Sequence, residues 1–153
     1  MLEMPKLQPL RIEVKKTNYP VRLWRWVTYI RKWKLLEDWT YTLRDGTTIL
    51  IPRDFVFNGA SIPRPFWAIL SPVGLLLIPS LIHDYAYVHD KLIAISDSGE
   101  QSDYNNKAGR VFWDTLFRDT AFDVNGIAIT STVAWLGVRL FGWIAWNSFH
   151  SAR

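Results

Sequence analysis

The chain has 153 residues, a formal net charge of +4 at pH 7 and no cysteine. This length suits one domain with a sizeable core, and the apolar fraction of 49%, with nine Trp, eight Phe and six Tyr, excludes general disorder. Without cysteine, neither disulfides nor thiolate metal sites can form. Residues 1–16 lack an apolar core segment, so we expect no secretory signal peptide.

The positive charge is concentrated at the N-terminal end. Residues 1–34 contain nine Lys or Arg against two Glu, whereas the remainder contains nine basic and twelve acidic residues. We expect a basic, aromatic arm or set of strands at 1–34 and a main body at 35–153, within one structural domain. The arm could bind DNA or a membrane, contact another protein, or simply be solvated. The side chains that would meet an anionic surface are Arg22, Trp24, Arg25, Trp26, Arg31 and Lys32.

The first predicted elements lie in this arm. Residues 10–15 alternate apolar and polar side chains and end at a Thr-Asn-Tyr-Pro turn, which predicts a short strand. Residues 21–34 fit a strand with Trp24 and Trp26 on one face, but they also fit a basic amphipathic helix. The conformation of residues 20–34 therefore stays open.

A β-hairpin and two helices are predicted next. Residues 39–52 form two β-branched and aromatic runs around Asp45-Gly46, which is typical of a hairpin turn. Pro79 can open a helix that continues to about residue 92. Ser102 or Asp103 can cap a further helix to about residue 121.

The C-terminal segment 127–146 is long and apolar. It contains one charge, Arg139, and its length suits a bilayer span. A central Arg costs about 2.5–3.5 kcal/mol on insertion into a membrane. We therefore favour a core helix, with Arg139 reaching a carboxylate or solvent, and keep a transmembrane span as the alternative.

Residues 54–90 hold the polar side chains that could do chemistry together. His83 and Tyr87 lie four residues apart and share a helix face, while Asp84 points about 100° round from His83. A histidine near its free pKa can act as a general base, and Asp84 with backbone carbonyls of the preceding Asn-Gly turn could hold a hard cation. The candidate ligand-binding residues of that turn are Asn58, Gly59 and Ser61.

The same residues also have a structural interpretation. His83 could donate to a backbone carbonyl, Asp84 could cap the helix or pair with Arg64 or Lys91, and the Tyr87 ring could pack in the core. The Asn58 turn could simply bond neighbouring amides. His89, further along the helix, is expected to be exposed. The sequence alone leaves both interpretations open.

Several motifs in a fixed order resemble a known family. They are Ile49-x-Ile51-Pro52-x-x-Phe55-x-x-Asn58-Gly59-Ala60-Ser61-Ile62-Pro63, then Trp67, Pro72-x-Gly74 and His83-Asp84-x-x-Tyr87. Over roughly residues 35–142 the chain resembles the phage and bacterial proteins grouped as domain-of-unknown-function family 1353. The resemblance implies a small α+β domain, often encoded by tailed phages and prophages, without a settled activity. Members usually have Asp in place of Asn58 and an Ala-Asp pair in place of Ala108-Gly109, so two carboxylates of the family pattern are absent.

A more distant likeness concerns the His-Asp-x-x-Tyr helix, which is similar to an active-site helix of secreted phospholipases A2. This likeness implies that His83 is a general base for water, that Asp84 is a calcium ligand and that Tyr87 is a supporting hydroxyl. It also implies an orienting aspartate on the following helix. The disulfides of the phospholipase fold are absent, since the chain has no cysteine.

The orienting residue is the weak part of this likeness. Asp114 is available on the following helix, but Arg110 and Arg118 lie one turn away on either side. We therefore expect Asp114 to lie on a solvated ion-pair face. Asn105, one turn before Gly109, is the expected substitute orienter.

The sequence thus predicts a single α+β domain, with N-terminal antiparallel strands and a β-hairpin packed on two or three helices. Two functions stay open. The first is a phage-encoded accessory or virion structural protein, in the virion or host cytoplasm, that binds other chains, DNA or membrane and could form a homo-oligomer. The second is a small hydrolase with a His83–Asp84 centre, phospholipase A2-like and calcium-assisted, acting on esters of lipids or the cell envelope. The two absent carboxylates and the excess of Trp favour the first, non-enzymatic role.

Overall fold

The computed structural model describes residues 4–10, 32–58 and 76–150. The described elements are β1 (Leu7–Pro9), β2 (Trp33–Leu35), β3 (Trp39–Thr42), β4 (Thr48–Ile51), β5 (Val56–Phe57), α2 (Leu77–His89), β6 (Leu92–Ile95), β7 (Gln101–Tyr104), α3 (Arg110–Asn125) and α4 (Ala128–His150). Short strands come first, and the long helices are in the C-terminal half. The predicted α+β class, with N-terminal antiparallel strands and helices after them, is confirmed.

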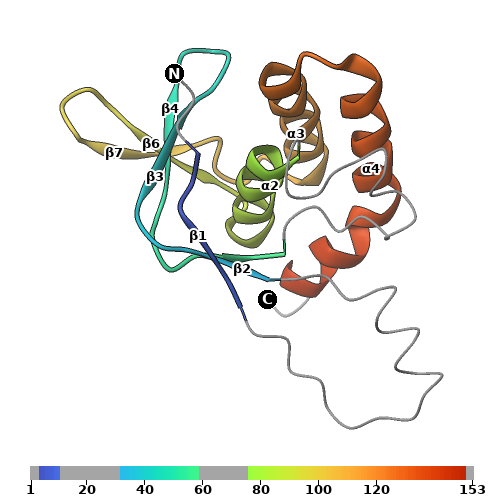
Figure 1. Cartoon of the computed structure of the whole chain (residues 1–153), viewed down its shortest axis with the longest axis horizontal. Helices are drawn as coiled ribbons and strands as arrows, with labels where there is room; N and C mark the ends of the chain where they lie inside the picture. The colour runs from blue at the N-terminus through green and yellow to red at the C-terminus, as the bar shows by residue number, and fades with distance from the viewer. Residues whose placement is uncertain (1–3, 11–31, 59–75, 151–153) are drawn as a thin grey trace, which may run out of the picture.

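The described strands form two antiparallel sheets. One has the order β1-β2-β5 and the other the order β3-β4-β6-β7. Figure 1 shows the strands on one side of the molecule and the helices on the other, with α2 between them. The predicted hairpin is confirmed, because β3 pairs with β4 from Trp39 opposite Ile51 to Thr42 opposite Thr48. Gly46 turns the chain there with a positive φ of 87°.

Helix α2 is the centre of the hydrophobic core. Ten of its thirteen residues are buried, which is typical of a helix covered on nearly all sides. Its apolar side chains pack against those of β4, such as Ile49 and Ile51, and against Trp113 of α3. The polar residues of α2 are therefore held in fixed positions between the sheet side and the other helices.

The predicted end of α2 is wrong by three residues. The helix ends at His89, because Asp90 adopts a left-handed conformation with φ of 50° and its N–H still bonds the Ala86 carbonyl. The chain then enters β6 at Leu92, a residue that the sequence placed inside the helix. Helix ends are predicted from Gly or Asn, which favour the left-handed conformation, so an Asp in this position does not mark the end of the helix in the sequence.

The predicted start of the next helix is also wrong. The segment from Gln101 to Tyr104 is strand β7, paired with β6, and α3 begins only at Arg110. Between them the backbone takes positive φ at Asn105, Lys107 and Gly109, which no helix allows. Ser102 and Asp103 resemble a helix cap locally, but pairing with β6 overrides that preference.

Helix α4 is not the core helix that we favoured from the sequence. Only Ser131 and Ala134 are buried along its 23 residues, because one side packs on α3 and α2 and the other is exposed. It is long and apolar enough to cross a membrane by length and composition alone. The expectation that Arg139 reaches a carboxylate is confirmed, since its Nη1 lies 3.3 Å from Oδ2 of Asp114.

Some predictions lie outside the described residues. These are the strand at 10–15 beyond Leu10, the segment 20–34 as far as residue 31, the anionic-surface residues from Arg22 to Arg31, and Gly59 and Ser61 of the turn. Of residues 20–34, the structure describes Lys32 and the first two residues of β2, Trp33 and Lys34.

Candidate functional site

A fully buried carboxylate on α3, Asp114, joins the three described helices. Its side chain has no exposed surface. Its Oδ1 atom faces His83 and Tyr87 of α2, and its Oδ2 atom faces Arg110 of α3 and Arg139 of α4. We call these five residues the Asp114 cluster. The expectation that Asp114 lies on a solvated ion-pair face is therefore wrong.

Helix α2 supplies the two neutral partners of the carboxylate. Nε2 of His83 lies 3.2 Å from Oδ1 of Asp114, and the Tyr87 hydroxyl donates a short hydrogen bond to the same oxygen. The two rings are neighbours with centroids 4.0 Å apart and planes tilted by 41°, as expected for side chains four residues apart on a helix. Phe117 of α3 contacts the His83 ring from another side, with centroids 5.2 Å apart. The imidazole is therefore fixed in orientation by packing as well as by Asp114.

The two arginines supply the positive charge that a buried carboxylate needs. Nη1 of Arg110 lies 3.2 Å from Oδ2 of Asp114, and it also donates to the Arg139 carbonyl at 3.1 Å. The Arg139 guanidinium contacts the same Oδ2. A buried charge without such partners would cost several kcal/mol, so these contacts offset the burial of the carboxylate.

The protonation states follow from burial and from this carboxylate. Burial lowers the pKa of His83, and its hydrogen bond and attraction to Asp114 offset only part of this effect. The imidazole is therefore neutral at pH 7. A carboxylate only accepts hydrogen bonds, so the contact places the imidazole hydrogen on Nε2 and leaves Nδ1 unprotonated. Burial, followed by the bond to Asp114, also raises the pKa of Tyr87, so that hydroxyl stays a donor.

Asp84 lies beside this cluster and meets the Asn58 turn. Its Oδ2 accepts the backbone N–H of Asn58 at 3.0 Å, so the structure brings together two of the predicted site residues. Burial raises the pKa of the Asp84 carboxyl to about 7, and the Asn58 N–H opposes this rise. Lys91, which the sequence offered as a partner for such a carboxylate, pairs instead with Asp103.

The described residues do not by themselves fit calcium. Calcium takes six to eight oxygen ligands, usually several carboxylates. Within the described ranges, no three His, Cys, Asp or Glu side chains lie close enough together to hold a metal ion. Asp84 offers one carboxylate, one oxygen of which already accepts an N–H.

Asn105 does not take the place that the sequence gave it. It follows β7 in an exposed turn with φ of 49° and is not on a helix. Asp114 of α3 is the residue that contacts Nε2 of His83 instead. A carboxylate therefore does lie beside His83, although Gly109 stands where family members usually have aspartate and the sequence favours a surface position for Asp114. His89 is exposed, as expected, and its ring lies against Tyr85.

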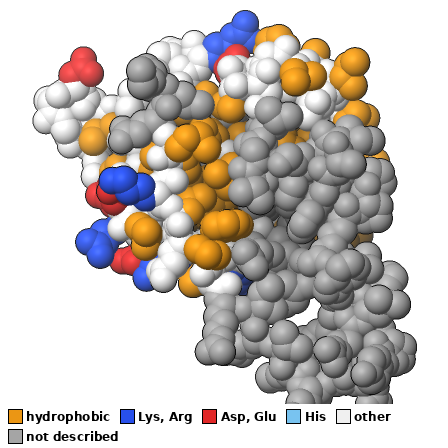
Figure 2. All heavy atoms as spheres, viewed as in Figure 1, with side chains coloured by type: hydrophobic (Ala, Val, Ile, Leu, Met, Phe, Trp, Pro, Cys, Tyr) orange, Lys and Arg blue, Asp and Glu red, His pale blue; other side chains and the backbone are white. Residues whose placement is uncertain are grey.

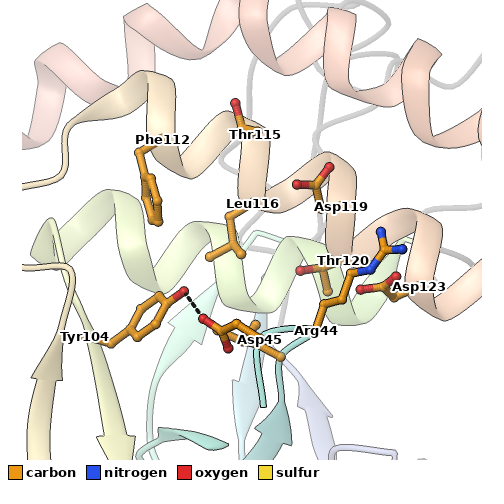
Figure 3. Close-up of a pocket in the computed structure, with 10 residues that line it drawn as sticks. Arg44, Asp45, Tyr104, Phe112, Thr115, Leu116, Asp119, Thr120 and Asp123 are labelled. Atoms are coloured by element: carbon orange, nitrogen blue, oxygen red, sulfur yellow. Dashed lines mark hydrogen bonds between the residues drawn. The ribbon is translucent and has the colours of Figure 1, made fainter. Parts of the chain in front are cut away.

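A separate hollow of about 230 Å³ lies on the other side of α3. Figure 3 shows Leu116, Asp119 and Asp123 facing it from α3, on the side of the helix opposite Asp114. Across the hollow, the Tyr104 hydroxyl donates to Oδ2 of Asp45 at 2.8 Å. No histidine lines this hollow; its ionisable side chains are Arg44, Asp45, Tyr104, Asp119 and Asp123.

Comparisons with known proteins identify the family and no activity. The model of the family described as "Protein of unknown function (DUF1353)" matches residues 33–138, which is more than half of the chain. No match was found among curated proteins or among solved structures. The family description names neither a phage nor a hydrolase, so both functional expectations from the sequence stay predictions.

Proposed function

We propose that this chain, which belongs to the DUF1353 family of proteins of unknown function, is a hydrolase in which His83 activates water. The substrate class that we propose is a carboxylic ester of a lipid or a similar cell-envelope molecule. One observation carries the proposal: a buried carboxylate, Asp114, contacts Nε2 of His83 at 3.2 Å. A histidine held in this way by a carboxylate is the usual arrangement of a general base.

The chemistry would use the Nδ1 atom of His83, which carries no hydrogen in this tautomer. Because the imidazole is neutral at pH 7, Nδ1 can take a proton from a water molecule as that water attacks the ester carbonyl. Asp114 would then stabilise the imidazolium that forms. When the tetrahedral intermediate collapses, Nδ1 returns the proton to the departing alkoxide. The net reaction converts ester and water into acid and alcohol.

Tyr87 and the two arginines would act through Asp114. The Tyr87 hydroxyl shares Oδ1 with His83 and fixes where that oxygen lies. Arg110 and Arg139 hold the opposite oxygen, Oδ2, so the carboxylate cannot rotate without breaking charged contacts. These are positioning residues, because they contact the carboxylate and not the attacking water.

The experiment is a hydrolysis assay with two esters. A soluble short-chain acyl ester and a phospholipid in vesicles are each tested with and without added calcium. His83→Gln keeps an N–H that can donate to Asp114 but has no basic nitrogen, so the rate should fall by about 10²–10⁴-fold. His89→Gln changes an exposed histidine of the same helix and should keep the wild-type rate.

Two outcomes would reject the proposal. One is a wild-type protein that hydrolyses neither ester under any of these conditions. The other is a folded His83→Gln protein as fast as the wild type. In either case the Asp114 cluster would be a structural link between helices.

A further inference from the structure

The outward side of α4 carries a continuous apolar stripe. Each member has another member three or four residues away, so all of them lie on one side of the helix. They are Ile129, Val133, Leu136, Leu140, Trp143 and Ile144, all at least 45% exposed. Figure 2 shows hydrophobic side chains at the upper right margin of the molecule, the side on which Figure 1 places α4.

The only Lys, Arg, Asp or Glu of α4 is turned away from this stripe. Arg139 directs its guanidinium to the buried Asp114, at 3.3 Å, on the inner side of the helix. The other ionisable group, His150, is at the last residue of the helix, where Nδ1 lies 3.0 Å from the Trp146 carbonyl oxygen. The exposed stripe therefore offers no charge to a partner.

We propose that this stripe docks the protein onto the surface of a lipid bilayer, with α4 lying in the plane of the membrane. A helix of 23 residues is about 35 Å long, and its most apolar window is only 17% buried. Burial in a core therefore does not explain its composition. Contiguous exposed apolar surface of this kind marks an interaction site.

The chemistry of the stripe suits lipid better than a second protein. Protein interfaces carry about one hydrogen bond per 100–200 Å². Among the stripe residues, Trp143 alone has a hydrogen-bonding side chain, and the exposed Thr132 and Asn147 lie at the borders of the stripe. Trp is favoured at the boundary between acyl chains and headgroups. The net charge of +4 adds a general attraction to anionic headgroups. The opposite side of α4 packs on α3 and α2. The helix would therefore lie on the bilayer surface and would not cross the bilayer.

Vesicle flotation tests the proposal, with vesicles of phosphatidylcholine alone and vesicles that also contain phosphatidylglycerol. The wild type should bind, more strongly to the anionic vesicles. The double variant Leu140→Glu/Ile144→Glu should lower the affinity by at least about tenfold, because it places two carboxylates in the apolar layer. Ile129→Glu, at the other end of the stripe, should weaken binding in the same direction. Val56→Glu makes the same kind of change at an exposed site on β5 and should bind like the wild type.

The docking proposal fails if the wild type binds neither kind of vesicle, or if the α4 variants bind as well as it does. It also fails if the stripe forms a protein dimer, which light scattering would show as a concentration-dependent mass that the α4 variants abolish. The inference does not depend on hydrolysis. His83→Gln should bind vesicles normally, and the α4 variants should keep any activity on the soluble ester.

Discussion

Asp114 and Arg139 come from different helices, and their contact directs the one strong charge of α4 toward the core of the protein. Nη1 of Arg139 lies 3.3 Å from the fully buried Oδ2 of Asp114. The same carboxylate holds His83 on α2. One side chain therefore links the candidate base, the central helix and the helix with the exposed apolar stripe.

Asp114→Ala should destabilise the protein by about 3–5 kcal/mol, because it leaves two arginines of the cluster without their counter-charge. Asp119→Ala is the control on the same helix. Asp119 is 44% exposed and pairs with Arg118, so its loss should cost less than about 1 kcal/mol. Urea denaturation measures both changes. Equal effects of the two substitutions would mean that the buried pairs do not stabilise the fold.

Gly142→Ala tests the close packing of α4 on Tyr87. A Cβ atom at Gly142 would lie 2.6 Å from the Tyr87 hydroxyl oxygen, so something must shift, at a cost of about 1–3 kcal/mol. Gly137→Ala is the control, since a Cβ there meets nothing within 4 Å. It should stabilise the helix by about 0.5–1 kcal/mol.

The same glycine allows a double-mutant test. In a Tyr87→Phe background the nearest atom to the new Cβ is a ring carbon at 3.4 Å, so the cost of Gly142→Ala should nearly vanish. If Gly142→Ala destabilised the Tyr87→Phe protein as much as the wild type, the strain would arise from another contact.

Asp90 should be important for stability although it is outside the candidate site. Its Oδ1 accepts both the Gly109 N–H at 2.9 Å and the Trp113 indole N–H at 2.7 Å, and so it ties the end of α2 to the start of α3. Asp90→Ala should cost about 1–3 kcal/mol, because both donors lose their acceptor.

Asp90→Asn is the matched comparison. It keeps an acceptor oxygen and tolerates the left-handed backbone at this position, so it should cost less than the alanine variant. Thermal or urea unfolding measures both. An Asp90→Ala protein with the same free energy of unfolding as the wild type would contradict this role.

The raised pKa of Asp84, about 7 in the folded protein, predicts a dependence of stability on pH. The unfolded carboxyl titrates near 3.9, so the folded state binds the proton more tightly. This contribution to stability is complete below about pH 4 and is lost as pH rises to about 7.

Asp84→Asn removes this titration while keeping an oxygen for the Asn58 N–H. Its melting temperature should match the wild type near pH 4 and exceed it at pH 8. A variant that is less stable than the wild type at pH 8 would show that the ionised carboxylate has a stabilising partner.

The sequence predicted the elements with strong local signals. The hairpin around Asp45-Gly46 and the shared face of His83 and Tyr87 depend on neighbours in the chain, and both are confirmed. Strand β7 is not predicted, because its polar residues gain their conformation only by pairing with β6.

The position of Asp114 could not be predicted from the sequence. Arg110 and Arg118 lie one turn away on either side, which favours a surface position for the carboxylate. Only the tertiary structure shows that Arg110 turns inward, that Arg118 pairs with Asp119 and that α4 covers the carboxylate.

The most direct test of the proposed function is the rate of ester hydrolysis by Asp114→Asn, measured against pH beside the wild type. The carboxamide has nearly the same shape, but its N–H₂ group can donate to Nε2 and so favour the tautomer with hydrogen on Nδ1, which cannot act as a base there. The wild-type rate should rise through an apparent pKa below the usual histidine value of about 6.5, since burial lowers the pKa of His83. The folded Asp114→Asn protein should be about 10²–10⁴-fold slower. An Asp114→Asn protein that hydrolyses the ester as fast as the wild type would contradict the assignment of His83 as the base.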